Sequence, residues 1–104
     1  MNTLFFEVAS VLGKKIHTTK NYWNYIVTIK HPSVRGLEDE VKRTLQEPTE
    51  VRKSREDPNV HLYYRKRMDK FICVVVKHLN NEGYIITTYL TRRMVGETLW
   101  KRSL

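Results

Sequence analysis

Residues 70–91 read KFICVVVKHLNNEGYIITTYLT, and this stretch decides the fold class. Residues 70–79 and 83–91 are both rich in β-branched and aromatic side chains, which favours two strands. The intervening NNEG has the residues of a short turn, so the two strands are expected to run antiparallel. The first strand is apolar on both sides of its pleat, which indicates a central strand covered on both faces, or covered on one and half covered on the other.

Two further strands are predicted immediately upstream. Residues 49–54 (TEVRKS) and 60–67 (VHLYYRKR) have strand-like composition, and the breaks REDPN and MD are typical turn sequences. Strands joined by such short turns pair as neighbours, so residues 49–91 predict a four-stranded antiparallel meander. The charged residues of VHLYYRKR also suit an edge strand that resists sheet-to-sheet aggregation.

The segment upstream of the meander predicts two helices. From Thr19 onward, Trp23, Ile26, Val27 and Lys30 fall on one helical face, with Thr19 or Asn21 as a possible N-cap. The letters YIVTI would also suit a strand, but Pro32 supplies a helix stop just after His31.

The second predicted helix lies between two prolines and has a clear apolar stripe. Val34, Leu37, Val41 and Leu45 form that stripe, Ser33 is a possible cap, and Pro48 ends the helix. Its acidic residues come first and its basic residues follow, as the helix dipole favours. Residues 4–12 and 14–18 are read as a short strand or the entry to a hairpin, and Leu99 and Trp100 as an anchor for the C-terminal tail.

Length and composition bound the class of protein. A chain of 104 residues has room for one domain with one core, so residues 1–104 are predicted to form a single α+β domain, with N-terminal helices packed on the four-stranded antiparallel sheet. Lys and Arg number 19 against 11 acidic residues, a net charge of +8. That imbalance points to a polyanionic partner, with nucleic acid ahead of a membrane surface, although solubility alone can also favour a basic surface.

Several classes of protein are disfavoured by what the sequence contains. The single cysteine, Cys73, cannot form an intrachain disulfide and lies in an apolar run, so it is read as a small core residue in a reducing compartment. No apolar run approaches the length of about 18 residues needed to span a bilayer, and no basic leader precedes the first apolar residues. We therefore expect a cytoplasmic protein without a membrane, metal or cofactor requirement.

The last hairpin is expected to form the floor of a cleft. With Leu79 opposite Tyr84, one face carries Phe71, Cys73, Val75, Ile86, Thr88 and Leu90 and is the better core. The other face carries Val74, Val76, His78, Thr87, Tyr89 and Thr91 and is the better cleft floor. Its rim would be formed by Tyr63 or Tyr64, Arg65, Lys66, Arg67, Arg52 and Arg55, closed at the far end by Arg92 and Arg93.

These residue types match the needs of metal-independent RNA cleavage. When the ribose 2′-hydroxyl is the nucleophile, the reaction needs a base, an acid and cations around the phosphate. Aromatic and basic residues in alternation, as in YYRKR, also suit single-stranded RNA. His31, between the predicted helices, is the leading candidate base, while a structural role at the helix junction or under Trp23 is the competing interpretation.

The order of these parts resembles a known group of nucleases. The pattern W-x-x-I, then HP, an amphipathic helix, L-x-x-P, V-R-x-S, LYYR, a Val-rich strand and TTYLT is similar to phage- and mobile-element-associated members of the barnase, EndoU, colicin and RelE superfamily. This resemblance covers about residues 16–100. It implies a metal-independent ribonuclease of toxin type, with its site on the open sheet face.

Residue by residue, the resemblance implies roles for His31, Arg52, Tyr64, Thr88 and Tyr89, with Arg65 and Lys77 as phosphate ligands. One departure is Tyr25, which stands where relatives often have a histidine, so that His31 would substitute for it or activity would be weakened. The leading hypothesis is a toxin-like endoribonuclease that acts on tRNA or mRNA, with Tyr89 and His31 as the acid and base candidates, and that needs an acidic antitoxin as partner. The alternatives are a non-catalytic RNA- or DNA-binding module and a phage inhibitor of a host nucleic-acid enzyme.

Overall fold

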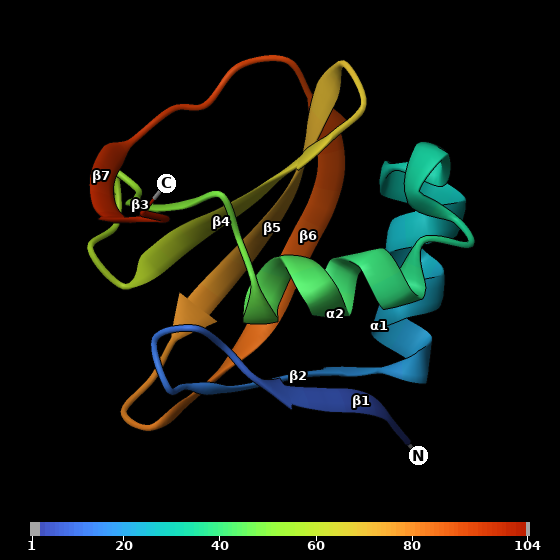
Figure 1. Ribbon diagram of the computed structural model, residues 1–104. Coiled ribbons are helices and arrows are strands. Elements are labelled where there is room, and N and C mark those ends of the chain that lie inside the picture. Colours follow the sequence, from blue (N-terminus) through green and yellow to red (C-terminus); the bar gives the residue numbers. More distant parts are fainter. Residues whose placement is uncertain (1–2, 104) are drawn as a thin grey trace.

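The computed structural model, which describes residues 3–103, has one mixed seven-stranded sheet with two helical segments packed against it (Figure 1). The α+β class is therefore confirmed. The strands are β1 (Leu4–Ala9), β2 (Lys15–Thr19), β3 (Glu50–Lys53), β4 (Val60–Arg67), β5 (Lys70–His78), β6 (Glu82–Thr91) and β7 (Glu97–Lys101). The helices are α1 (Lys20–Tyr25), its π-helical continuation η1 (Ile26–Lys30), the 3-10 turn η2 (Pro32–Val34) and α2 (Glu38–Gln46).

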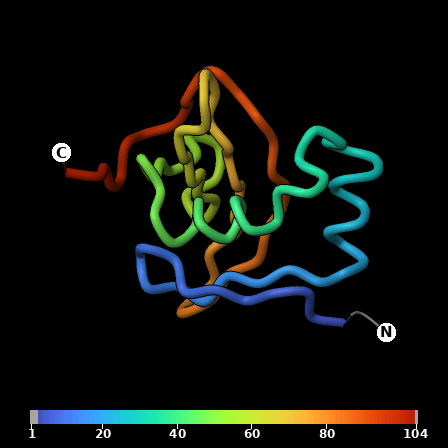
Figure 2. Tube along the Cα trace, turned by 45° about the vertical axis from the view of Figure 1, so that its right-hand side comes forward, coloured from blue at the N-terminus to red at the C-terminus, as the bar shows by residue number. Residues whose placement is uncertain are grey.

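The prediction of a four-stranded antiparallel sheet is wrong, because three more strands extend it. The strand order is β1-β2-β6-β5-β4-β3-β7. The predicted meander β3 to β6 lies at its centre and is antiparallel throughout, whereas β2 pairs with β6 in parallel and β7 pairs with β3. The two ends of the chain therefore form opposite edges of the sheet (Figure 2).

The helices are also not strictly N-terminal, because a β-hairpin precedes them. The sequence left residues 4–18 open between a strand and a hairpin entry, and β1 and β2 pair as an antiparallel hairpin. A shift of register between Leu4 and Phe6 interrupts the alternation in β1, and β2 turns Thr18 into the protein interior beside Ile16. A buried threonine and an irregular register both weaken the period-2 pattern by which a strand is recognised.

The first predicted helix is confirmed, together with one of its two possible caps. The Thr19 hydroxyl accepts a hydrogen bond from the backbone N–H of Tyr22, which satisfies one of the free donors at the start of α1. Trp23, Ile26 and Val27 are buried, and Pro32 follows directly after the helical run, as predicted.

The second helix is shorter than predicted and has no side-chain cap. Ser33 lies inside η2, and the N-cap position of α2 is Leu37. Three acidic residues, Glu38 to Glu40, occupy the first turn, and Arg43 lies in the last, so the charges offset the helix dipole.

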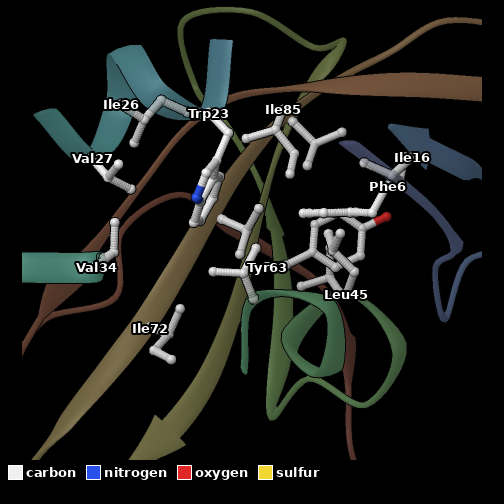
Figure 3. Packing of buried hydrophobic residues seen from close by; sticks show 14 residues of the cluster. Phe6, Ile16, Trp23, Ile26, Val27, Val34, Leu45, Tyr63, Ile72 and Ile85 are labelled. Carbon is white, nitrogen blue, oxygen red and sulfur yellow. The ribbon is translucent and has the colours of Figure 1, made fainter. Parts of the chain in front are cut away.

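The main core lies between α2, the α1–η1 segment and one face of the sheet, which we call the core face (Figure 3). Trp23 and Val27 reach it from the helical segment, Leu45 from α2, and Tyr63 and Ile72 from the sheet. The Trp23 indole N–H also donates to the Glu38 carboxylate at 3.3 Å, which ties α1 to α2. Trp100 packs against this core, so one of the two residues predicted to anchor the tail does so, while Leu99 is 50% exposed.

The predicted assignment of sheet faces is wrong for β5. Val74 and Val76 belong to the core face, while Cys73, Phe71 and Val75 lie on the opposite side. The reason is a register one residue away from the expected one, with an irregularity between Val75 and Val76, so that Cys73 pairs with Tyr89. We call this opposite side, which carries Leu62, Tyr64, Cys73 and Tyr89, the tyrosine face.

Within residues 3–103, no helix is long and apolar enough to cross a membrane.

Candidate functional site

The tyrosine face places two phenols and a thiol together in the middle of the sheet. Tyr64 on β4, Cys73 on β5 and Tyr89 on β6 belong to one cluster, and Tyr64 and Cys73 are fully buried. Burial, followed by the proximity of Cys73, raises the pKa of Tyr64 to about 12, and the same two causes raise that of Tyr89 further above its ordinary value. Burial also raises the pKa of the Cys73 thiol to about 11. All three groups are therefore protonated near neutral pH and act as hydrogen-bond donors.

His31 lies beside Tyr89, so the two residues predicted as acid and base share one site. Their ring centroids are 5.4 Å apart, with 42° between the planes. The backbone geometry explains the meeting: β2 pairs with β6 only as far as Tyr84, and the helical segment then runs along β6 to His31. Burial, and to a lesser extent the charge of Lys30, lowers the pKa of His31, which favours the neutral imidazole.

Arg52, a predicted catalytic residue, is held by an ion pair within the sheet. Its Nε lies 2.9 Å from Glu50 Oε1, and its Nη1 donates to the Met94 carbonyl at 3.1 Å. Burial alone would raise the pKa of Glu50, but hydrogen bonds from Thr98 and Arg52 and the nearby cations outweigh it and lower that pKa. Arg52 therefore fixes the connection from β6 to β7, residues 92–96.

That connection covers one end of the tyrosine face. Met94 packs against the cluster, and the Val95 N–H donates to the Tyr64 hydroxyl at 3.1 Å. Figure 1 shows the same segment passing from β6 across to the far edge of the sheet, where β7 begins. Tyr64 thus supports residues 92–96, and its hydroxyl is already engaged.

A groove of about 500 Å³ remains open beside Tyr89. Arg55 and the turn that carries Asp57 line this groove, and so do Val95 and Gly96. Lys77, a predicted phosphate ligand, is bonded to Asp57, with Nζ and Oδ2 2.7 Å apart, and this hydrogen bond lowers the pKa of Asp57. Among residues 3–103, Arg55 is the cation that lines this groove and has no ion-pair partner.

The remaining basic residues of β4 are divided between the two faces. Lys66 lies over the Phe71 ring on the tyrosine side, 5.0 Å from its centroid. Arg65 donates to the Glu47 carbonyl at 2.6 Å, and Arg67 pairs with Glu40 at 2.7 Å, so both bind α2 on the core side. The predicted grouping of Arg65 and Arg67 with the cleft is therefore wrong, because alternate residues of a strand point to opposite faces.

The three threonines predicted as site residues lie in different places. Thr88 is fully buried and donates to the Cys73 carbonyl at 2.8 Å, which leaves it no surface for a substrate and no support for a catalytic role. Thr87 and Thr91 pair with Val75 and Phe71 and so lie on the tyrosine face. The hydroxyl of Thr87 is buried and has no hydrogen-bond partner within residues 3–103.

The two arginines after β6 are the first residues of this connection, and both are exposed. Arg92 reaches Asp69 at 3.3 Å, in a pair that is about 70% exposed on both sides, and Arg93 is exposed. Tyr25 stands where the resembled nucleases often have a histidine. Its ring centroid lies 6.0 Å from that of Tyr22, and the residue is 46% exposed. Sequence reasoning missed the acidic partners Glu50 and Asp57, although the spacing of Glu50 and Arg52 places them on one face of a strand.

Comparison with known proteins identifies no relative: no family model, no curated protein and no solved structure matches this chain. The described part of the chain also contains no group of three or more His, Cys, Asp or Glu side chains arranged to hold a metal ion. The residues of the tyrosine face and His31 are therefore the basis for inferring a function.

Proposed function

We propose that this protein is an endoribonuclease of toxin type, which cleaves tRNA or mRNA through the ribose 2′-hydroxyl at the site formed by His31 and Tyr89. The observation that carries the proposal is the proximity of these two rings, with centroids 5.4 Å apart, where Tyr89 also lines the groove that contains Arg55. An imidazole with a lowered pKa next to a phenol with a raised one supplies a base and a hydrogen-bond donor.

In the proposed step, the neutral imidazole of His31 accepts the proton of the 2′-hydroxyl. The 2′-oxygen forms a bond to the adjacent phosphorus, and the bond from phosphorus to the 5′-oxygen breaks. The hydroxyl of Tyr89 gives its proton to that 5′-oxygen, and Arg55, with Lys77 behind it, stabilises the charge on the phosphate. The products are a 2′,3′-cyclic phosphate and a 5′-hydroxyl.

The charge of the whole chain supports a nucleic-acid partner. A net charge of +8 on 104 residues attracts polyanions, and phosphate contacts supply most of the affinity in such complexes. An acidic antitoxin that covers the groove is the protein partner we propose, in the cytoplasm of the producing cell.

One specific observation favours a second candidate, a non-catalytic module that binds RNA or DNA. Tyr89 is engaged in a buried cluster with Cys73, and Tyr25 stands where the resembled nucleases often carry a histidine. A chain that kept the basic surface and lost the base would bind without cleaving. A phage protein that blocks a host nucleic-acid enzyme would use the same surface.

The test is incubation of the purified protein with total tRNA and with a long single-stranded RNA in EDTA, beside the Tyr89→Phe variant. Discrete fragments from the wild-type protein, reduced by about 10²-fold or more in Tyr89→Phe at unchanged RNA affinity, are expected. Phenylalanine keeps the ring against His31, so the substitution removes only the hydroxyl. Intact RNA that is nevertheless bound would refute the nuclease and support the binding module.

A further inference from the structure

A second hollow, of about 400 Å³, lies between α1, β2 and β6, and the proposed mechanism does not use it. In Figure 1, α1 rises from the end of β2 beside β6, and the residues that line the hollow come from these three elements. A volume of about 400 Å³ is within the range of small-molecule sites. Its lining residues are His17, Thr18, Thr19, Asn21, Tyr22, Tyr25, Tyr84 and Ile85.

Four ring side chains form the wall of this hollow. The ring centroids of Tyr22 and Tyr25 on α1 are 6.0 Å apart, and those of His17 on β2 and Tyr84 on β6 are 6.5 Å apart. The three tyrosines are 36% to 46% exposed, so that their rings remain accessible from solvent. Partly exposed rings from two directions offer flat surfaces to a planar ligand.

The hollow is held in place by a bond to the sheet. The Tyr22 hydroxyl donates to the Ile86 carbonyl at 2.6 Å, next to the irregularity where β6 departs from its register with β5. Burial raises the pKa of Tyr22, and the neighbouring Tyr25 and Tyr84 raise it further. The hydrogen bond fixes the ring of Tyr22 before any ligand arrives, which reduces the entropic cost of binding.

Apart from His17, the polar side chains that line the hollow carry amide, hydroxyl and phenol groups, and the charges nearby are of both signs. Asn21 and Thr19 offer amide and hydroxyl groups, whereas the hydroxyl of Thr18 is buried in the protein interior. On the neighbouring strands, Glu82 pairs with Lys15 and Glu7 pairs with His17 in register. Rings with neutral donors and acceptors suit a nucleobase, whereas a phosphate would require an excess of cations.

We propose that this hollow binds an unstacked nucleobase of single-stranded RNA, at a subsite separate from the groove beside Tyr89. The inference rests on the proposed function for the identity of the ligand. Tyr84 pairs with Lys77, and so lies on the tyrosine face, five residues before Tyr89 on the same strand, or about 17 Å along β6. An RNA strand that crosses β6 places one base on these rings while another nucleotide reaches His31 and Tyr89.

The experiment measures the affinity of a short single-stranded RNA whose 2′-hydroxyls are methylated, so that cleavage cannot interfere. Fluorescence anisotropy in EDTA at fixed salt compares the wild-type protein with Tyr84→Ala and Tyr25→Ala. Tyr84→Phe is the matched variant that keeps the ring, and Leu99→Ala on β7, where Leu99 is 50% exposed, is the surface control. Each alanine variant is expected to bind at least about fivefold more weakly, and both controls should bind like the wild-type protein.

A measurement on the unmodified protein keeps the test decisive if an alanine variant fails to fold. Addition of AMP or UMP should shift the ring-proton NMR signals of Tyr22, Tyr25 and Tyr84. Unchanged RNA affinity in both folded alanine variants, or ring signals that no nucleotide moves, would overturn the subsite. The exposed stripe that continues from these tyrosines to Ile29, 67% exposed, would then be an interface with another protein.

The two proposals fail in different ways. Weaker RNA binding by Tyr84→Ala, with no cleavage by the wild-type protein, would support the base subsite and refute the nuclease. Cleavage by the wild-type protein, with RNA affinity unchanged in Tyr84→Ala, would refute the subsite alone.

Discussion

His78 at the end of β5 makes the folded protein sensitive to mild acid. Its ring stacks on His61, with centroids 3.8 Å apart, and its Nε2 lies 3.0 Å from the oxygen of Tyr63, whose hydroxyl donates to Ser10 Oγ. Burial, with smaller contributions from His61 and Lys14, lowers the pKa of His78 from 6.5 to about 4. Only 7% of His78 is exposed, so the charged form has little water to stabilise it.

The direction of the effect follows from proton binding. Between pH 6.5 and about 4, the unfolded chain binds a proton at this position and the folded chain does not, so stability is complete above pH 6.5 and falls as the pH drops. A pKa lowered from 6.5 to about 4 corresponds to a loss of about 3 kcal/mol across this range, or about 1.4 kcal/mol per pH unit. His61, whose pKa burial also lowers, acts in the same direction.

Urea unfolding at several pH values between 4 and 7.5 measures this loss. His78→Gln removes the titrating ring and keeps an N–H that can donate to the Tyr63 oxygen, so the variant should lose less stability than the wild-type protein as the pH falls. The difference between the two slopes isolates His78 from the carboxylates, which both proteins share. Equal slopes would refute the reasoning, because they would mean that folding leaves the pKa of His78 unchanged.

Three further predictions follow from other parts of the structure. Gly96→Ala should lower the free energy of unfolding, measured in urea, by more than about 2 kcal/mol, because Gly96 has φ of +92° and a Cβ there would lie 2.7 Å from the Lys53 carbonyl oxygen. Gly36→Ala, at φ of +84° in open space, should cost only the backbone penalty of about 1–2 kcal/mol. Equal losses of stability in the two variants would contradict the clash at Gly96. Cys73, fully buried with its pKa raised to about 11, should resist iodoacetamide at pH 8 until the protein unfolds, and rapid labelling of the native protein would show that the tyrosine face opens. If His31 is the base, the acidic limb of the cleavage rate should lie below pH 6.5, since burial lowers the pKa of His31, and a limb above pH 6.5 would exclude it from that role.

The centre of the sheet could be predicted because its residues leave little choice. In β5 and β6, β-branched residues flank a clear turn, and Thr19 and Pro32 mark the two ends of the first helix. The outer strands could not be predicted in the same way. In β7 only Trp100 packs against the core, and in β2 the polar Thr18 is buried, so neither strand shows a regular apolar pattern.

The site could be predicted only in part, because it depends on register. Ile85 and Ile86 are both apolar, so the sequence does not show that the β5–β6 register changes at this point. That change places Cys73 opposite Tyr89. The alternation of side chains along β4 places Arg65 and Arg67 on the core side. The sequence predicts His31 and Tyr89 as acid and base candidates, whereas the parallel pairing of β2 that brings their rings together has no signal in the sequence.

The most direct test of the central claim is cleavage of one RNA oligonucleotide, in EDTA, by the wild-type protein and by His31→Ala. The same oligonucleotide with methylated 2′-hydroxyls serves as the matched substrate. The proposal predicts that the wild-type protein cuts only the unmodified RNA and leaves a 2′,3′-cyclic phosphate, and that His31→Ala cuts it about 10²-fold or more slowly with unchanged affinity. Cleavage of the methylated RNA, full activity in His31→Ala, or no cleavage by the wild-type protein would contradict it.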